Sequence, residues 1–210
     1  MKLWSDSLVN GEPIPERHAL GRLLADGGVA CSDNLSPHLA WSDLPTGTRS
    51  LSLVCHDFDV PTPGAIVSAN ARELPADLAR ADFFHWLLVD LPTSVTQLRE
   101  GEFSRGLTAR GKPGPASLHG SRQGLNDYTT WFAADTKLAG TYFGYDGPFP
   151  PPNDPLVHHC LFTLYALSVD RLGVTGAFTG EQVRRALAGC VLGAATLSGT
   201  YTLNPRLSGR

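Results

Sequence analysis

Three apolar runs that can form buried β-strands constrain the fold of this chain more than any other feature of its sequence. They lie at residues 50–56, 83–91 and 158–169. Each has polar, chemically active side chains at or near one end, namely those of Asp57, Asp59, His85 and His158. Strand ends allow such groups to converge without burying a charge inside a sheet. The sequence therefore predicts a β scaffold with a small polar pocket at its strand ends.

The composition supports a β-rich fold and excludes several classes of function. There are 16 prolines and 22 glycines, and only 18% of residues are charged, which is untypical of a helical bundle. We expect one domain over residues 1–210, with 42% hydrophobic residues to form its core. A net charge of −3 gives no basic surface for nucleic acid.

The N-terminus and the cysteines bear on the cellular compartment of the protein. No apolar run approaches the roughly 18 residues of a transmembrane helix, and the first residues lack the apolar segment of a signal peptide. The four cysteines form no CxxC pair, which leaves zinc-ribbon and thioredoxin-type sites without support. We therefore expect a cytoplasmic protein with free, mostly buried thiols.

The remaining secondary structure is less regular. The Asp/Pro cluster after residue 56 should end the first strand, and residues 62–81 form a polar insertion with a helical turn near 75–81. A capping box at Thr179 predicts a helix from Gly180 to about Ala194. A last strand is expected from Thr196 to Leu203.

Five motifs occur in a fixed order along the chain. They are Cys31-x-x-Asn34-x-Ser36-Pro37-x-Leu39-x-Trp41, His56-Asp57-x-Asp59-x-Pro61, His85-Trp86, Gly147-Pro148-x-Pro150-Pro151 and His158. Together they resemble the phosphatidylethanolamine-binding protein family, and most closely its bacterial Raf-kinase-inhibitor-like branch. The resemblance spans about residues 27–203.

The resemblance implies a mainly β, antiparallel β-sandwich-like fold with a few peripheral helices. It also implies a binding protein that is not an enzyme, with a small pocket for an anionic ligand such as phosphate or a phospholipid head group. The residues that would line the pocket by position are Asp57, Asp59, His85, Gly147, Pro148 and His158. No cofactor or metal is implied. The family resemblance further implies that the protein forms a homodimer and modulates a kinase or protease partner.

The chain departs from the family pattern at the pocket rim. Phe58 stands where a proline is usual, and His159 and Cys160 replace an arginine and a tyrosine. These changes bear on ligand choice more than on the fold. We expect His159 on the opposite strand face from His158, because side chains alternate along a strand.

Two carboxylates in an anion pocket need a physical explanation, because they repel a phosphate. One workable arrangement has an aspartate that orients an imidazole, while protonated His85 or His158 faces the anion. Backbone N–H groups near Gly147 could add donors. The residues have plainer interpretations too: Asp57 and Asp59 can cap a turn, and His85 can be a core histidine.

Three other functions remain open from the residues alone. A metal-dependent hydrolase could use the histidine and aspartate cluster, with His56 included, although no HxxEH or HxH spacing is present. A cysteine–histidine nucleophile would need Cys55 or Cys160. The third alternative is a pure interaction protein. No phosphate-binding loop, dinucleotide fingerprint or nucleophile elbow occurs.

Overall fold

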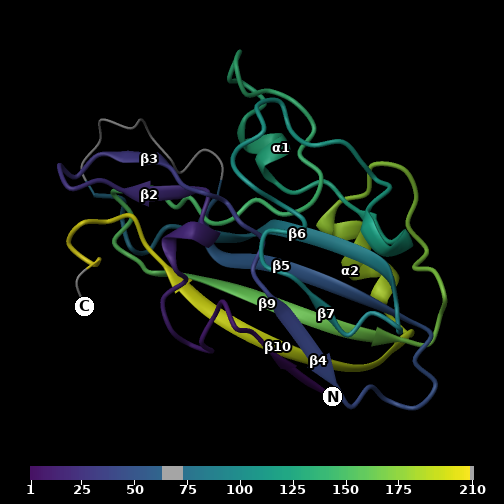
Figure 1. Ribbon diagram of the computed structural model, residues 1–210. Helices are drawn as coiled ribbons and strands as arrows, with labels where there is room; N and C mark the ends of the chain where they lie inside the picture. The colour runs from purple at the N-terminus through teal and green to yellow at the C-terminus, as the bar shows by residue number, and fades with distance from the viewer. Residues whose placement is uncertain (63–72, 209–210) are drawn as a thin grey trace.

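A large antiparallel sheet forms the centre of the molecule. Within residues 1–62 and 73–208, which the computed structural model describes, this sheet has five strands in the order β10-β9-β5-β6-β8 (Figure 1). The strands are β5 (Ser50–Pro61), β6 (Arg80–Pro92), β8 (Arg122–Gln123), β9 (His158–Leu167) and β10 (Val191–Tyr201). The three predicted apolar runs are thus neighbours, with β5 hydrogen-bonded to β6 on one side and to β9 on the other.

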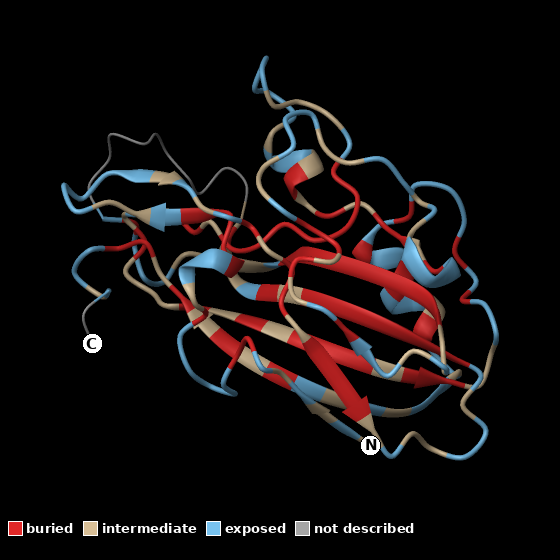
Figure 2. Cartoon of the chain, in the orientation of Figure 1, coloured by how far each residue is buried: buried red, intermediate tan, exposed pale blue. Residues whose placement is uncertain are grey.

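The two faces of this sheet pack against different partners, as the alternation of side chains requires. On one face, Leu53 and Cys55 of β5 share a core with Leu39 and Trp41 of a smaller sheet. That sheet has the order β1-β4-β7 and is formed by β1 (Lys2–Trp4), β4 (Leu39–Ser42) and β7 (Gln97–Leu98). Figure 2 shows how continuously β5 and β6 are buried.

On the other face, Val54 and Leu87 pack against Val183 and Leu187 of helix α2 (Gly180–Leu187). The other elements are short: the strand pair β2 (Gly21–Leu23) and β3 (Val29–Cys31), the 3₁₀ helices η1 (Glu16–His18) and η2 (Leu118–Gly120), and α1 (Tyr128–Trp131). The expected mainly β, antiparallel fold is therefore confirmed.

The register of β5 brings the chemistry-bearing residues together. Asp57 lies opposite Cys160 of β9 and opposite Phe83 of β6. The pairing with β6 shifts between Cys55 and His56 and again between Asp57 and Val60. Such bulges bend a strand and redirect its side chains, and they are common beside functional sites.

Several predicted boundaries are wrong, among them the end of the first strand, the end of the helix and the start of the last strand. The first strand does not end at the Asp/Pro cluster but continues to Pro61, because the bulges absorb the irregular residues within the ladder. Of the predicted insertion, residues 63–72 lie outside the described residues, and Leu78 N–H donates to Pro75 O (3.3 Å) in a turn at the predicted place.

The helix predicted to reach Ala194 ends at Leu187. Gly189 then takes a positive φ of 81°, which a helix cannot continue, and Ala194 pairs with Tyr165 of β9. The last strand therefore begins before Thr196. The helix start is as expected, since Gln182 Oε1 accepts from Thr179 N–H at 2.9 Å. In the described part of the chain, no helix is long and apolar enough to span a membrane.

The contact between α2 and the sheet gives a first prediction. A Cβ on Gly180 would lie 2.2 Å from the Phe84 ring, and Phe84 is buried. Gly180→Ala should therefore cost about 1–3 kcal/mol in the free energy of unfolding, as overpacking does. Gly173→Ala is the matched control, because no described atom lies within 4 Å of its Cβ position. Denaturant unfolding of both variants checks this, and equal losses would contradict it.

Candidate functional site

A small pocket lies where the central strands β5, β6 and β9 come together. Its floor is formed by Asp57, His85 and His158, one from each strand, all nearly inaccessible to solvent. Its wall is formed by further residues, namely Val60, Phe83, Tyr128, Trp131, Phe149, Pro150 and Pro151. About 20 Å³ is open to the centres of water-sized atoms, so the pocket suits a compact group.

His158 is held between two carboxylates. Its Nδ1 donates to Asp57 Oδ2 at 2.6 Å, and its Nε2 donates to Asp154 Oδ2 at 3.2 Å. Burial opposes the charged ring, but the hydrogen bonds to Asp154 and Asp57 outweigh it and raise the pKa of His158 to about 9. The imidazolium is therefore present at neutral pH, with both N–H groups already used inside the protein.

Asp154 is the second partner of this imidazolium. Burial disfavours its carboxylate, but hydrogen bonds from His158 and from Arg80 hold the pKa of Asp154 at about 2. Arg80 approaches it with two nitrogens, at 2.6 and 3.1 Å. Asp57 and His158 of the pocket floor, together with Asp154 and Arg80 behind it, thus form a group of two carboxylates and two cations whose charges cancel.

His85 differs from His158 in having one free nitrogen. Its Nδ1 donates to the backbone oxygen of Asp146 at 2.8 Å, whereas its buried Nε2 has no hydrogen-bond partner among the described residues. Burial lowers the pKa of His85, so the ring is neutral at pH 7. Because Nδ1 carries the proton, the Nε2 lone pair is available to a ligand.

The position of Asp146 is set by a buried hydrogen-bond network. Its carboxylate accepts from Asn34 (2.7 Å), Asn126 (2.8 Å) and the Lys112 ammonium (2.9 Å). These residues come from three separate loops. The same network holds Gly147, whose N–H donates to Asn34 Oδ1 at 2.8 Å. The loop that forms the pocket wall is thereby tied to the chain segments beneath it.

The structure brings three of the six predicted site residues together at the pocket floor. Asp57, His85 and His158 line the pocket, whereas Asp59, Gly147 and Pro148 are not among the described residues that do so. Instead, Asp59 Oδ2 forms a hydrogen bond with His159 Nδ1 at 2.8 Å. The His159 side chain is 45% exposed and His158 is fully buried, as expected for opposite strand faces.

Gly147 and Pro148 position the wall. The Gly147 N–H that was expected to face an anion is already paired with Asn34, and a Cβ at Gly147 would lie 2.1 Å from His18 O. Pro148 O accepts from Leu20 N–H at 3.0 Å. Ligand contacts of these two residues stay a prediction.

Sequence reasoning missed the aromatic wall and Asp154. Tyr128 is buried, and its hydroxyl donates to Gly147 O at 2.7 Å, while Trp131 is 39% exposed at the rim. Phe83 contacts both rings, with centroid distances of 4.9 and 6.1 Å. The available signal was the spacing of Tyr128 and Trp131, which places both on one side of a helical turn.

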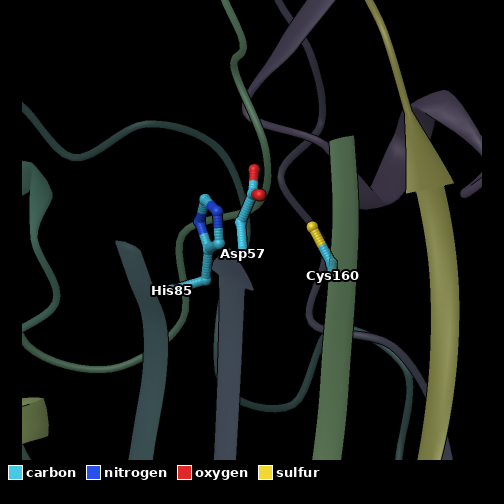
Figure 3. Close-up of side chains that lie close together, drawn as sticks. All are labelled: Asp57, His85 and Cys160. Atoms are coloured by element: carbon cyan, nitrogen blue, oxygen red, sulfur yellow. The ribbon is translucent and has the colours of Figure 1, made fainter. Parts of the chain in front are cut away.

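The buried thiols bear on the nucleophile alternative. Burial, with a smaller effect of Asp57, raises the pKa of Cys55 and of Cys160 well above 9. Both groups are therefore neutral thiols at pH 7, and the thiolate is the nucleophilic form. This counts against a cysteine–histidine nucleophile. Cys160 nevertheless lies beside Asp57 and His85, as Figure 3 shows.

Comparison with known proteins identifies the family. Residues 4–202 match the profile described as "Phosphatidylethanolamine-binding protein". The chain belongs to this family. The sequence-based recognition of phosphatidylethanolamine-binding proteins is thus confirmed, and membership supports a binding-protein role.

Individual relatives and solved structures agree with this assignment. The UPF0098 protein YbhB of Escherichia coli is 33% identical over 187 residues, which cover 87% of this chain and 90% of that protein. YbcL of E. coli, described as a member of the mammalian PEBP family, has a structure with a TM-score of 0.67 at 25% identity, covering 96% of this chain and 97% of the other. CT736 of Chlamydia trachomatis, a PEBP homolog, gives 0.63 at 27% identity, with 95% of each chain covered.

The raised pKa of His158 predicts how stability changes with pH. A histidine that is easier to protonate in the folded state stabilises the protein fully below about pH 6.5, and this contribution is lost as pH rises through about 9. The difference between the ordinary histidine pKa of 6.5 and the folded-state pKa of about 9 corresponds to about 3 kcal/mol in the free energy of unfolding. Denaturant unfolding between pH 6 and pH 9.5, in about half-unit steps, measures it.

His158→Gln should flatten that decline, while His159→Gln, which changes the neighbouring and half-exposed ring, should leave it in place. A decline of the same size in His158→Gln would show that another group is responsible.

Proposed function

We propose that the pocket binds a small anionic ligand of the phosphate or phospholipid head-group type. The observation that carries this proposal is the buried Nε2 of His85, which has no partner within the described residues although it belongs to a pocket-lining side chain. Buried polar atoms are nearly always hydrogen-bonded, and leaving one unpaired costs about 1–3 kcal/mol. A ligand atom at this position would remove that cost.

The protonation of the pocket favours a ligand that brings its own hydrogen. The His85 ring is neutral, so its Nε2 can accept from the O–H of a singly protonated phosphate. When the proton moves to Nε2, the same contact becomes a charge-assisted bond to the anion. This differs from the sequence-based expectation that a free imidazolium faces the ligand, since both N–H groups of His158 are engaged by carboxylates.

The charge balance of the floor allows an anion to approach. Asp57 and Asp154 are offset by His158 and Arg80, which contact them at 2.6 to 3.2 Å. The repulsion that two unpaired carboxylates would exert on phosphate is therefore largely neutralised. Beyond the floor, the Trp131 and Tyr128 rings could contact an apolar or cationic remainder of the ligand.

The binding test compares two histidines of the central sheet: His85 of β6 lines the pocket, whereas His159 of β9 does not. His85→Ala should weaken binding of inorganic phosphate and of phosphorylethanolamine by about 1.5–3 kcal/mol, the usual worth of a hydrogen bond to a charged group. His159→Ala should change either affinity little, because that ring lies outside the pocket. Isothermal titration calorimetry on both variants measures the losses.

Equal losses in the two variants would contradict the proposed binding mode. A Trp131→Ala variant separates the ligand sources. If this variant weakens the binding of phosphorylethanolamine but not of inorganic phosphate, the pocket recognises a head group with its amine. If it changes neither, the free anion is the better match.

A further inference from the structure

Three potential metal ligands from three adjacent strands meet beneath the pocket. One ligand atom each from Asp57, His85 and Cys160 lies within 4.8 Å of the other two. Figure 3 shows the three side chains rising from the same side of β5, β6 and β9, with the Cys160 sulfur directed toward Asp57. All three residues are at most 2% exposed.

We propose that Asp57, His85 and Cys160 form a zinc site with one open coordination position toward the pocket. A carboxylate, an imidazole and a thiolate are all established zinc ligands, and three protein ligands with an open fourth position are typical of zinc sites that bind a further ligand. The thiol selects a thiophilic ion over magnesium or calcium.

The strongest support is the state of His85. A metal-binding histidine usually donates its other N–H to a backbone carbonyl or a carboxylate, which fixes the ring and leaves a lone pair for the metal. His85 has this arrangement: Nδ1 donates to Asp146 O at 2.8 Å, and Nε2 is buried and unpaired within the described chain. Because buried polar atoms are nearly always hydrogen-bonded, this unpaired nitrogen indicates a partner that the described residues do not supply.

Asp57 is oriented in a comparable way. Its Oδ2 accepts from His158 Nδ1 at 2.6 Å, and its Oδ1 accepts from Asp59 N–H at 2.7 Å. Each carboxylate oxygen retains a second lone pair. Hydrogen-bonded ligating carboxylates are typical of metal sites, because the outer partners hold the ligand in place.

The ligand positions need only a small adjustment. Zinc–ligand distances of about 2.0–2.3 Å in a tetrahedron place the ligand atoms about 3.3–3.8 Å apart. The three ligand atoms lie within 4.8 Å of one another, so side-chain movements of about one ångström bring them to zinc-binding distances. On binding, the S–H bond of Cys160 breaks, a sulfur–zinc bond forms, and the proton leaves to solvent.

A zinc ion would also account for anion binding in a floor that is otherwise neutral. The two carboxylates Asp57 and Asp154 and the cations His158 and Arg80 cancel. A divalent ion with one thiolate adds a single positive charge, and the open position faces the pocket that Asp57 and His85 line. This second step rests on the proposed function, whereas metal binding itself does not.

Cobalt(II) titration of the metal-free full-length protein tests the site with the metal alone. A sulfur-to-cobalt charge-transfer band and the intense visible bands of tetrahedral cobalt are expected at one equivalent. Cys160→Ala should abolish the charge-transfer band and weaken cobalt affinity by at least on the order of 100-fold, since even outer-shell partners cost 10–100-fold. Cys55→Ala is the matched control, because Cys55 is equally buried on the neighbouring strand.

Absence of the charge-transfer band in the wild-type protein overturns the zinc site, whether or not the variants fold. Its persistence in Cys160→Ala overturns the assignment to this thiol. Elemental analysis of protein purified without chelator gives a second measure, and about one zinc per chain is expected.

Phosphate titrations of the metal-free and zinc-loaded forms separate this inference from the proposed function. Tighter phosphate binding in the zinc-loaded form supports the zinc site and an anion-binding pocket, with phosphate bound to zinc in place of the direct contact with His85 Nε2. A cobalt band without phosphate binding in either form overturns the proposed function and leaves the metal site. Phosphate binding without a cobalt band overturns the metal site and leaves the proposed function. Equal phosphate affinity in both forms overturns the open coordination position toward the pocket.

Discussion

The buried carboxylate of Asp146 is the interaction on which the pocket most depends. It accepts hydrogen bonds from Asn34, Asn126 and Lys112, which lie far apart in the sequence. Its own backbone oxygen then fixes the proton of His85 on Nδ1. A buried ion pair of this kind adds little to stability by itself, but its disruption leaves an uncompensated charge. Its main effect here is to set where three loops meet and which nitrogen faces the pocket.

Asp57 is the second point at which structure and chemistry meet. It belongs to the central strand, where neighbours on both sides supply backbone hydrogen bonds, so its position is firmly set. Its side chain connects the imidazolium of His158 with the bulge at Asp59. The same carboxylate therefore stabilises the bent strand and determines the charge of the pocket floor.

The strands and the pocket floor could be predicted from the sequence because they depend on local signals. The apolar runs identify β5, β6 and β9, and motif order identifies Asp57 and His85 within two of these strands and His158 at the start of the third. The sequence places the end of α2 too late because Val191 continues the apolar spacing of Val183 and Leu187, although Gly189 ends the helix and the residues that follow pair with β9. Pairing with a distant strand is not visible in a local window.

The partners of the floor could not be predicted in the same way. Asp154 and Asp146 lie in a proline-rich and glycine-rich loop whose course depends on bonds to remote residues such as Arg80 and Asn34. Tyr128 and Trp131 of the aromatic wall are contributed by α1, a single turn that the sequence scarcely indicates. Loop placement therefore decided which polar residues became site residues and which remained structural.

The pocket combines a floor built on central strands with a wall built on a short helix and a loop. The floor is preorganised, so holding a ligand there requires little ordering of the protein. Trp131, at 39% exposure, can change rotamer without disturbing any strand pairing. We therefore expect the lifetime of a complex to be governed by the wall, and its chemical selectivity by the floor. Related chains could then exchange ligands at very different rates while recognising the same charged group.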